Sequence, residues 1–435
     1  MDWKDLESDV VRCSRCGACQ QVCPIFREMG TEAAATRGKI SLIRSAIQGW
    51  VPDSAALSER MSLCLACKAC AANCPSGVKG DQLVLAARQR LVERRGLPLI
   101  KRLALRFFLR NRWIFRTGMK LGPLGQRLVL RRIPQGSLPR LPMGLDRRRL
   151  VPELAASPLR EGLPECIEAA EARGRVALFT GCMVNHIYPE IGKAAIEVLL
   201  NQGISVLIPP DQHCCGLPAH ANGDGDTARE LGRATLETFQ RYPVDAVITL
   251  CGSCGSTLRH EYLEWFASDP ALRPLAQSLA AKVQDFAQYL ANIGLRGALA
   301  PLDARVTYHD SCHLARGMGV TREPRELIRA IPDLVFQEME TPARCCGAAG
   351  SFSLAHYDLT RKINARKTED ILATGASTVI TGCPGCIMQL KDGLYQQNTK
   401  IDVIHLAQLL RQVIIRNPIP PTLALNSDPE TRVLP

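Results

Sequence analysis

Residues 13–24 read CSRCGACQQVCP, and residues 64–75 read CLACKACAANCP. In both stretches four cysteines are separated by two, two and three residues, and proline follows the last cysteine. The 435-residue chain contains 19 cysteines, an odd number that cannot pair completely in disulfides. A large cytosolic chain keeps its thiols reduced, which also argues against a disulfide framework. The repeated spacing therefore predicts that these cysteines bind metal.

The spacing of the two runs is that of two-cluster ferredoxins, in which cysteine thiolates hold [4Fe-4S] iron-sulfur clusters. The first three cysteines of each run bind one cubane cluster, and the fourth, turned away by its proline, binds the other. A tetrahedral zinc site leaves no role for the third close cysteine and the Cys-Pro pair, although a colourless zinc-binding scaffold stays the alternative. The predicted ligands are Cys13, Cys16, Cys19 and Cys74 for cluster site 1, and Cys64, Cys67, Cys70 and Cys23 for cluster site 2.

The second half of the chain is an internal duplication. Short β-rich runs alternate with helical stretches, which is typical of a parallel α/β sheet. Matching cysteines in the two copies are offset by 130, 131 and 132 residues, so the copies stay in register. The repeated segments are RVALFTGC (175–182) with ARVTYHDSC (304–312), HCCG (213–216) with RCCG (344–347), and DAVITLCGSC (245–254) with STVITGCPGC (377–386).

Each copy carries five cysteines that follow predicted strands, and the carboxyl ends of parallel strands meet at the ligand-binding edge of a sheet. Two adjacent cysteines on a regular strand point to opposite sides, but a following glycine permits a turn that aims both at one object. A polynuclear cluster with five thiolates suits this arrangement better than zinc. The first Cys-Cys-Gly module comprises Cys182, Cys214, Cys215, Cys251 and Cys254, and the second comprises Cys312, Cys345, Cys346, Cys383 and Cys386.

These modules resemble the Cys-Cys-Gly domain pair of heterodisulfide reductases and of the iron-sulfur subunits of glycolate and lactate dehydrogenases. The stretches CSRCGACQQVCPIFREMGTEAAATRGKISLIR and CLACKACAANCPSGV are similar to the N-terminal domain of glycolate oxidase iron-sulfur subunits and their D-lactate dehydrogenase relatives. Together the motifs span most of residues 11–410. The resemblance implies that all ten module cysteines are candidate ligands of one or two further [4Fe-4S] clusters, of the non-cubane kind found in heterodisulfide reductases.

The resemblance implies an electron-transfer subunit of a 2-hydroxy-acid (D-lactate or glycolate) dehydrogenase, which is an oxidoreductase. A separate FAD subunit would oxidise the substrate, and a quinone or another carrier would accept the electrons. No Gly-x-Gly-x-x-Gly loop is present, so we expect no flavin or nucleotide site in this chain. Many glycolate oxidase subunits read Asn-Pro-Gly-Cys where this chain has Cys383-Pro384-Gly385-Cys386. The complete second module keeps open the alternative of a heterodisulfide reductase-like subunit that reduces a disulfide, and no catalytic residue is assigned.

The predicted fold class is multidomain, α followed by α/β. Isoleucines at 40, 43 and 47 and apolar residues at 83, 87 and 91 recur at helical spacing. The stretch KRLALRFFLRNRWIF (101–115) is amphipathic and the residues after it are rich in arginine and proline, which predicts a helix and then an irregular linker. The predicted domains are 1–95, all-α and ferredoxin-like; 96–170, basic linker; 171–297, first Cys-Cys-Gly domain; 298–415, second Cys-Cys-Gly domain; and 416–435, disordered tail.

The positive charge is concentrated in one part of the chain. Between Arg88 and Arg149 there are 18 Lys or Arg against two acids, a net +16, so the remainder sums to about −4 of the total +12. A solvated linker, a docking surface for an acidic partner subunit and an interfacial membrane contact are three interpretations of this segment. Nucleic-acid binding is not expected, because aromatic interleaving and recognition motifs are lacking.

The sequence favours a cytoplasmic protein, with a peripheral contact at the inner face of the membrane as an option. No stretch of about 18 uncharged apolar residues occurs, and the acidic start MDWKDLESDVV does not resemble a signal peptide. His213, His309 and His313 lie beside cysteines, where they could tune a cluster or carry protons, or simply pack as polar loop residues. Cys166 lies outside every motif, and we expect an incidental role for it.

Overall fold

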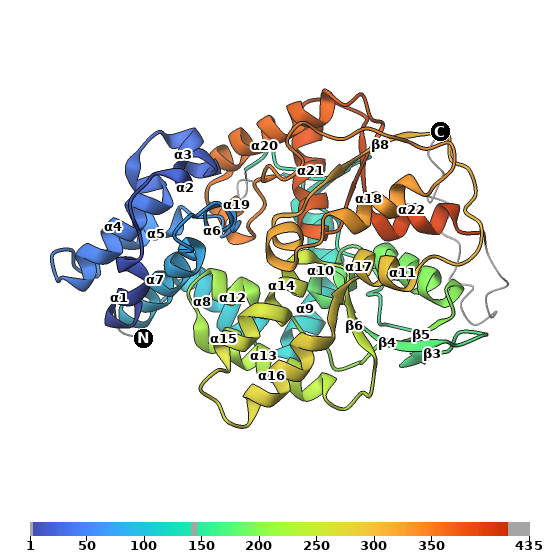
Figure 1. Ribbon diagram of the computed structural model, residues 1–435, viewed down its shortest axis with the longest axis horizontal. Coiled ribbons are helices and arrows are strands. Elements are labelled where there is room, and N and C mark those ends of the chain that lie inside the picture. The colour runs from blue at the N-terminus through green and yellow to red at the C-terminus, as the bar shows by residue number, and fades with distance from the viewer. Residues whose placement is uncertain (1–2, 141–145, 416–435) are drawn as a thin grey trace.

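The computed structural model describes residues 3–140 and 146–415 and comprises a helical N-terminal region and two α/β units (Figure 1). The predicted disordered tail at 416–435 lies outside the described residues. Helices and parallel α/β sheets are both present, as the sequence predicted. The exact domain limits stay a prediction.

The N-terminal region consists of helices that pack around a small apolar core. Ile40 and Ile43 of α4 are buried with Leu83 and Ala87 of α7, so the helical spacing read from the sequence is confirmed. Gly96 ends α7 at a positive φ of +75°, which suits glycine. The elements are η1 (Trp3–Leu6), α1 (Glu7–Val11), α2 (Ala18–Gln21), α3 (Pro24–Met29), η2 (Glu32–Ala34), α4 (Thr36–Ile47), α5 (Ala55–Ser62), α6 (Ala69–Ala72) and α7 (Gly80–Arg95).

The basic segment is more ordered than the sequence predicted. The expected single helix is interrupted at Asn111, whose side-chain oxygen accepts hydrogen bonds from the amides of Trp113 and Ile114, both at 3.1 Å, and so begins a new helix. An antiparallel hairpin then replaces the start of the expected irregular stretch, because residues 130–133 pair with 136–139 across a two-residue loop. The elements are α8 (Leu99–Arg102), the π-helix η3 (Leu103–Leu109), α9 (Arg112–Val129), β1 (Leu130–Ile133) and β2 (Gly136–Pro139).

The first α/β unit is a five-stranded sheet in the order β3-β5-β4-β6-β7, parallel except for the edge strand β3. Its strands β5 and β6 are buried along their whole length, as expected for strands covered on both faces. The strands are β3 (Cys166–Ile167), β4 (Gly174–Phe179), β5 (Ile204–Leu207), β6 (Ala246–Thr249) and β7 (Val283–Asp285). The helices are α10 (Gly181–His186), α11 (Pro189–Asn201), α12 (Leu217–Ala221), α13 (Gly225–Phe239), α14 (Gly252–Ser256), the π-helix η4 (Thr257–Glu261), α15 (Tyr262–Trp265), α16 (Leu272–Lys282) and α17 (Phe286–Ile293).

The second α/β unit repeats the first with a parallel four-stranded sheet in the order β11-β10-β8-β9. In chain order β4, β5, β6 and β7 correspond to β8, β9, β10 and β11, so the predicted duplication extends to the sheet topology. The strands are β8 (Arg305–His309), β9 (Val335–Phe336), β10 (Thr378–Thr381) and β11 (Asp402–His405). The helices are the π-helix η5 (His313–Met318), α18 (Arg322–Arg329), α19 (Ser351–Ala355), α20 (Tyr357–Leu372), α21 (Pro384–Gln396) and α22 (Leu406–Val413).

The two α/β units share one continuous apolar core. Arg411 of α22 donates to Glu197 of α11 at 2.7 Å, and α14 of the first unit packs against η5 of the second. The amide of Gly252 donates to the carbonyl of Gly382 at 3.3 Å, so the segments that follow β6 and β10 meet directly. The cysteines of the two modules lie at this junction.

Candidate metal centres

The two N-terminal cysteine runs have the same unusual backbone. The residues on either side of the second cysteine of each run adopt a left-handed conformation. They are Arg15 and Gly17 in the first run, and Ala66 and Lys68 in the second. Three of these four residues are not glycine, and for such residues a positive φ is costly and persists only where the surroundings require it. Such turns point successive backbone N–H groups inward and are typical of anion-binding loops. The repeated conformation suits a loop that wraps an anionic cluster.

Cluster site 1 is a small cavity near the surface of the helical region. Its lining includes all four predicted ligands, although Cys70 also reaches it, and its volume is about 30 Å³. Cys16 is exposed, and a hydrogen bond from the backbone of Ala18 lowers the pKa of its thiol. The four cysteines assigned to this site are therefore close together, at the edge of the molecule.

Cluster site 2 brings Cys23 from the first run to the cysteines of the second. Burial, together with the nearby thiols of Cys64 and Cys67, raises the pKa of Cys23 to about 11. Burial likewise raises the pKa of Cys70, again with contributions from Cys64 and Cys67. Four neighbouring thiols, one buried and three half-buried, are the arrangement expected of the ligands of one cluster.

Buried cations surround cluster site 2. Arg88 donates to the carbonyl oxygens of Cys64 at 2.6 Å and Ser62 at 3.0 Å, and Lys39 is 1% exposed. Burial lowers the pKa of both cations, while Cys64 raises the pKa of each. Buried charges need a partner of opposite sign. An anionic thiolate-bound cluster would provide that partner.

The first Cys-Cys-Gly module gathers its five cysteines from three segments. Cys182 lies in α10, Cys214 and Cys215 precede Gly216, and Cys251 is the N-terminal cap of α14. Gly216 has φ +89°, the positive-φ turn that the sequence predicted after the cysteine pair. Each thiol of the module alters the pKa of the next, in the order Cys182, Cys214, Cys215, Cys254 and Cys251, so the five lie side by side.

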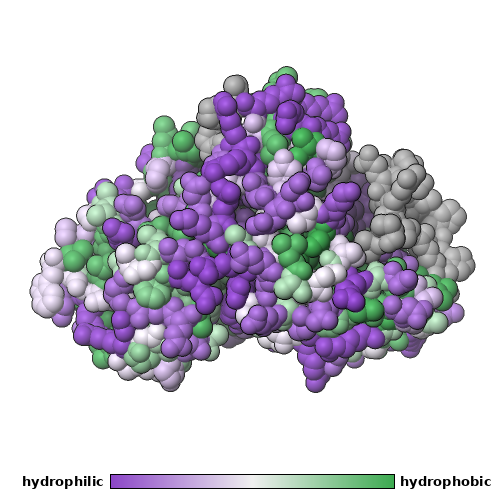
Figure 2. Space-filling model, turned by 90° about the horizontal axis from the view of Figure 1, so that it is seen from above, coloured by the Kyte–Doolittle hydropathy of each residue, from purple (hydrophilic) through white to green (hydrophobic). Residues whose placement is uncertain are grey.

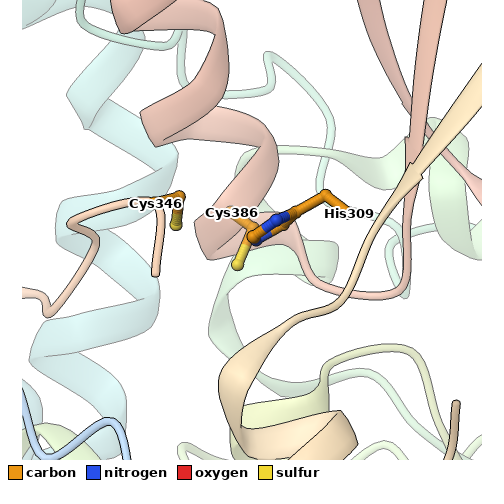
Figure 3. A group of neighbouring side chains, drawn as sticks. All are labelled: His309, Cys346 and Cys386. Carbon is orange, nitrogen blue, oxygen red and sulfur yellow. The ribbon is translucent and has the colours of Figure 1, made fainter. Parts of the chain in front are cut away.

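The second module repeats this arrangement. Its thiols lie side by side in the corresponding order Cys312, Cys345, Cys346, Cys386 and Cys383. His309, at the end of β8, points toward Cys346 and Cys386, and one ligand atom from each lies within 4.8 Å of the others (Figure 3). Among the described residues neither ring nitrogen of His309 has a hydrogen-bond partner, and burial lowers its pKa to about 3. A neutral imidazole therefore faces the thiols of this module.

Neighbouring sites meet through cysteines that are far apart in the sequence. The thiol of Cys345 in the second module lies beside that of Cys67 in cluster site 2 and raises the pKa of Cys67. The sulfurs of Cys251 and Cys383 are 3.8 Å apart, which joins the two modules. Traced through these cysteine contacts, and through the assigned exchange of Cys23 and Cys74 between the first two sites, the ligand sets form a row in the order cluster site 1, cluster site 2, second module and first module.

His313 ties three of these sites together. It follows Cys312 of the second module, and its ring contacts Ser253 Oγ of the first module at 3.1 Å and the carbonyl of Ala66 in cluster site 2 at 2.9 Å. His213 accepts a hydrogen bond from the amide of Cys214 at 2.7 Å through Nδ1. The predicted tuning or proton-carrying role of these histidines stays a prediction.

The residues present fit iron-sulfur clusters. Backbone amides donate to four cysteine sulfurs at 3.3–3.4 Å, and such N–H···S bonds are among the interactions that adjust the potential of a bound cluster. The sulfurs concerned are those of Cys23, Cys64, Cys74 and Cys345. Cys166, in contrast, lies on the edge strand β3 with its sulfur 3.1 Å from Glu168 Oε1, away from the other sites.

Several supporting residues were not foreseen from the sequence. Ser311 Oγ is 3.2 Å from the sulfur of Cys386, and Asn364 donates to the carbonyl of Cys346 at 2.7 Å. Tyr262 donates to the carbonyl of Cys215 at 3.1 Å, and Arg316 donates to that of Cys67 at 3.1 Å. Ser311 could have been noticed, because it directly precedes a cysteine. The others are distant in sequence and carry no motif.

Comparisons with known proteins agree with this geometry. Residues 9–78 match the family described as 4Fe-4S dicluster domain, and residues 176–259 and 306–391 match the Cysteine-rich domain. The chain is 32% identical over 417 residues to the probable glycolate oxidase iron-sulfur subunit of Bacillus subtilis, covering 93% of this chain and 94% of that protein. The chain belongs to this family of iron-sulfur subunits. The predicted resemblance is thereby confirmed, as are an oxidoreductase role and the binding of [4Fe-4S] clusters.

Other relatives share part of the chain. Lactate utilization protein A of Bacillus subtilis is 32% identical over 237 residues, 54% of this chain and 98% of that protein. A subunit of the fumarate reductase (CoM/CoB) of Methanothermobacter marburgensis is 33% identical over 237 residues, 54% of this chain and 46% of that protein. Two of these relatives are thus named as subunits of oxidoreductases, which implies a partner subunit.

A solved structure supports the overall fold. A hypothetical protein from Helicobacter pylori covers 98% of this chain and 79% of its own at 11% identity, with a TM-score of 0.53. No helix within residues 3–140 and 146–415 combines the length and hydropathy needed to cross a membrane.

Proposed function

We propose that this chain is the electron-transfer subunit of a 2-hydroxy-acid dehydrogenase whose substrate is D-lactate or glycolate. A separate FAD subunit would supply the electrons, and a quinone or another carrier would accept them. The names of the relatives support this substrate class. The observation that carries the proposal is the row of adjoining ligand sets, joined by the Cys67–Cys345 and Cys251–Cys383 contacts.

The ligands are those assigned from the spacing, with two cubane clusters at cluster sites 1 and 2 and one or two further [4Fe-4S] clusters at the modules. When bound, such clusters supply one-electron carriers whose potentials span roughly −700 to +450 mV. The chain's own part is to hold these groups close together and, except at cluster site 1, away from water. The mutual closeness of each set of thiols and the burial of half of the eighteen cysteines support the assignment.

The two ends of the row differ in exposure. At one end Cys16 is exposed, so a donor can approach cluster site 1 closely. At the other end Cys214, Cys215, Cys251 and Cys254 of the first module are buried. We infer that electrons enter at cluster site 1 and leave through the first module.

The proposal is tested by reconstitution of the cluster-loaded chain with and without an FAD subunit under anaerobic conditions. Addition of D-lactate or glycolate should bleach the iron-sulfur absorbance only when the FAD subunit is present. The Cys166→Ser variant is the matched control and should behave like the unchanged chain. A brown preparation with about 12 to 16 irons per chain is expected, whereas a colourless protein would indicate a zinc scaffold.

A second outcome would support a different function. If the chain alone reduces a disulfide with an artificial electron donor, the heterodisulfide reductase-like alternative is correct and the relay proposal is wrong. The complete Cys383–Cys386 pair is the feature that makes this comparison necessary.

A further inference from the structure

One continuous segment carries half of the exposed large hydrophobic side chains. Sixteen such side chains occur among the described residues, and eight of them lie on the segment 99–129, here called the α8–α9 surface. The face of the molecule in Figure 2 is mostly hydrophilic, with hydrophobic patches of limited extent. The eight residues are Leu99, Ile100, Leu103, Phe107, Trp113, Leu121, Leu124 and Leu128.

In the first half of the α8–α9 surface the exposed apolar residues share one face. Leu99, Leu103 and Phe107 recur every four residues and are 66%, 52% and 59% exposed. Leu105 and Leu109 point the other way and are buried in the core of the α/β units. The segment therefore has two apolar faces: Leu105 and Leu109 pack in the core, and the outward face is left exposed.

Helix α9 likewise has one exposed apolar face and one face that packs on the protein, over a greater length. Trp113, Leu121 and Leu128 lie on one face at helical spacing and are 77%, 57% and 79% exposed. The opposite face packs on the protein, where the Phe115 ring lies 5.3 Å from that of His186 and 5.4 Å from that of His213. At 18 residues α9 is about 27 Å long. Its exposed apolar face is thus a stripe along a helix that is already anchored.

The same segment is strongly basic. Residues 99–129 contain eight Lys or Arg and no Asp or Glu. Acids from elsewhere in the chain pair with four of these cations and fix the helices in place, whereas Arg116 and Arg127 are exposed and form no ion pair with a described residue. The four pairs are Arg106–Asp224, Arg110–Glu230, Arg112–Asp211 and Lys120–Glu161.

We propose that the α8–α9 surface docks on an anionic lipid bilayer, with its helices lying in the interface plane. Leu, Phe and Trp side chains would enter the boundary between headgroups and acyl chains, and unpaired arginines would contact anionic headgroups. Charge complementarity favours an anionic occupant, because the surface offers cations and no acid, and the exposed apolar side chains along both helices favour a lipid bilayer among anionic occupants. No described helix can span a membrane, so the contact is peripheral.

The docking would bring the first module to the membrane. Phe115 of α9 packs against His213, which directly precedes Cys214. A lipid-soluble acceptor would then approach the end of the row from which electrons are proposed to leave. The docking itself does not depend on the relay, since vesicle binding is measured without any electron donor.

The test is co-sedimentation of the cluster-loaded full chain with vesicles, under anaerobic conditions and at several salt concentrations. Vesicles of phosphatidylglycerol mixed with phosphatidylcholine are compared with vesicles of phosphatidylcholine alone. The test variant combines Trp113→Glu, Leu121→Glu and Leu128→Glu. The matched control places the same charges at other exposed apolar sites, as Trp50→Glu, Leu354→Glu and Leu372→Glu.

We expect binding to the anionic vesicles that weakens with salt, and at least about a tenfold loss in the test variant against less than about twofold in the control. Arg116→Gln with Arg127→Gln should reduce the salt dependence of binding. Cluster absorbance and the thermal midpoint show whether each variant is folded, and the arginine variant gives an independent result if the glutamates disturb α9. The proposal is overturned if the unchanged chain ignores anionic vesicles, if the control loses as much affinity, or if the test variant binds vesicles normally but no longer binds an FAD subunit.

Discussion

The two Cys-Cys-Gly modules have the same five cysteines but different surroundings. The residue before the first cysteine is Gly181 in the first module, where φ is +58° and there is no side chain. The second module has Ser311 at the equivalent position, and its hydroxyl lies 3.2 Å from the sulfur of Cys386. Hydrogen bonds to cluster sulfurs alter the reduction potential. The two modules have therefore kept the same five candidate cysteine ligands but differ in the hydrogen bonds made to the cysteine sulfurs.

The charges around the modules differ as well. Asp310 in the second module forms a buried ion pair with Arg325 at 2.9 Å, and Arg325 also pairs with Glu338 at 2.6 Å. The equivalent residue in the first module is Thr180, which is uncharged and donates to Gln212 at 2.8 Å through its amide. At this position only the second module therefore depends on buried charge for its stability.

Loss of one module cysteine should have the largest effect and should separate the modules. Cys346→Ser is expected to remove the second module's iron and Cys215→Ser that of the first, each lowering the iron content by about four per chain. Each variant should leave the other module's spectrum unchanged. Iron analysis and electron paramagnetic resonance of anaerobic samples measure this, with Cys166→Ser as the control. Simultaneous loss of both modules in either variant would show that they assemble as one unit.

Removal of Arg325 should destabilise the second module more than any surface charge change. Arg325→Ala leaves the carboxylate of Asp310 buried without its cation, which costs about 3 kcal/mol or more of the free energy of unfolding. Arg322→Ala on the same helix removes an exposed pair with Glu326 and should cost less than about 0.5 kcal/mol. Chemical denaturation of the loaded chain compares the two. Equal free energies of unfolding in the two variants would contradict the burial of the Arg325–Asp310 ion pair.

The residues that begin α17 and α22 give the equivalent helices of the two units different pH responses. Asp285 caps α17 with a hydrogen bond at 2.8 Å from the amide of Ala287, and His405 caps α22. Burial raises the pKa of Asp285 to about 7, so the folded state binds more protons than the unfolded state between about pH 4 and 7. Stability should therefore fall as pH rises through this window. Asp285→Asn should remove that fall in stability, which is measured as the thermal midpoint of unfolding at a series of pH values. The same dependence of the midpoint on pH in the variant and the unchanged chain would refute the role of Asp285.

Ser311→Ala should have the smallest effect and would test the comparison of potentials directly. A hydrogen bond donated to a thiolate favours the more negative, reduced cluster, so its loss should lower the second module's potential. A bond of about 1 kcal/mol corresponds to a few tens of millivolts for one electron. A redox titration followed by electron paramagnetic resonance checks this, with the exposed Ser377→Ala as control. A higher potential in Ser311→Ala would show that the hydroxyl does not donate to Cys386.

Apolar periodicity and the repeated β-rich runs predicted the mixture of helices and parallel α/β sheets, and cysteine spacing predicted the candidate site. The repeated strands and the turns at Gly216 and Gly347 follow from local pattern and are seen in the structure, whereas the assignment of Cys23 and Cys74 to opposite clusters stays a prediction. The interruption at Asn111 was missed, because apolar periodicity continues through a residue that also begins a helix.

The contacts between sites could not be read from the sequence. The meetings of Cys67 with Cys345 and of Cys251 with Cys383 depend on how separately folded segments pack. His313 reaches Ser253 and Ala66 for the same reason. Local pattern determines which residues form a site, whereas tertiary packing determines the order of the sites.

The order of the sites is tested most directly by freeze-quench electron paramagnetic resonance on Cys346→Ser, which is expected to lack the second module's cluster. The chain is mixed with an FAD subunit and its 2-hydroxy acid, and the reduction of the N-terminal clusters and of the first module is followed in time. The account predicts that the N-terminal clusters become reduced while the first module stays oxidised, because the site between them is interrupted. Reduction of both at the rate of the unchanged chain would contradict the proposed row.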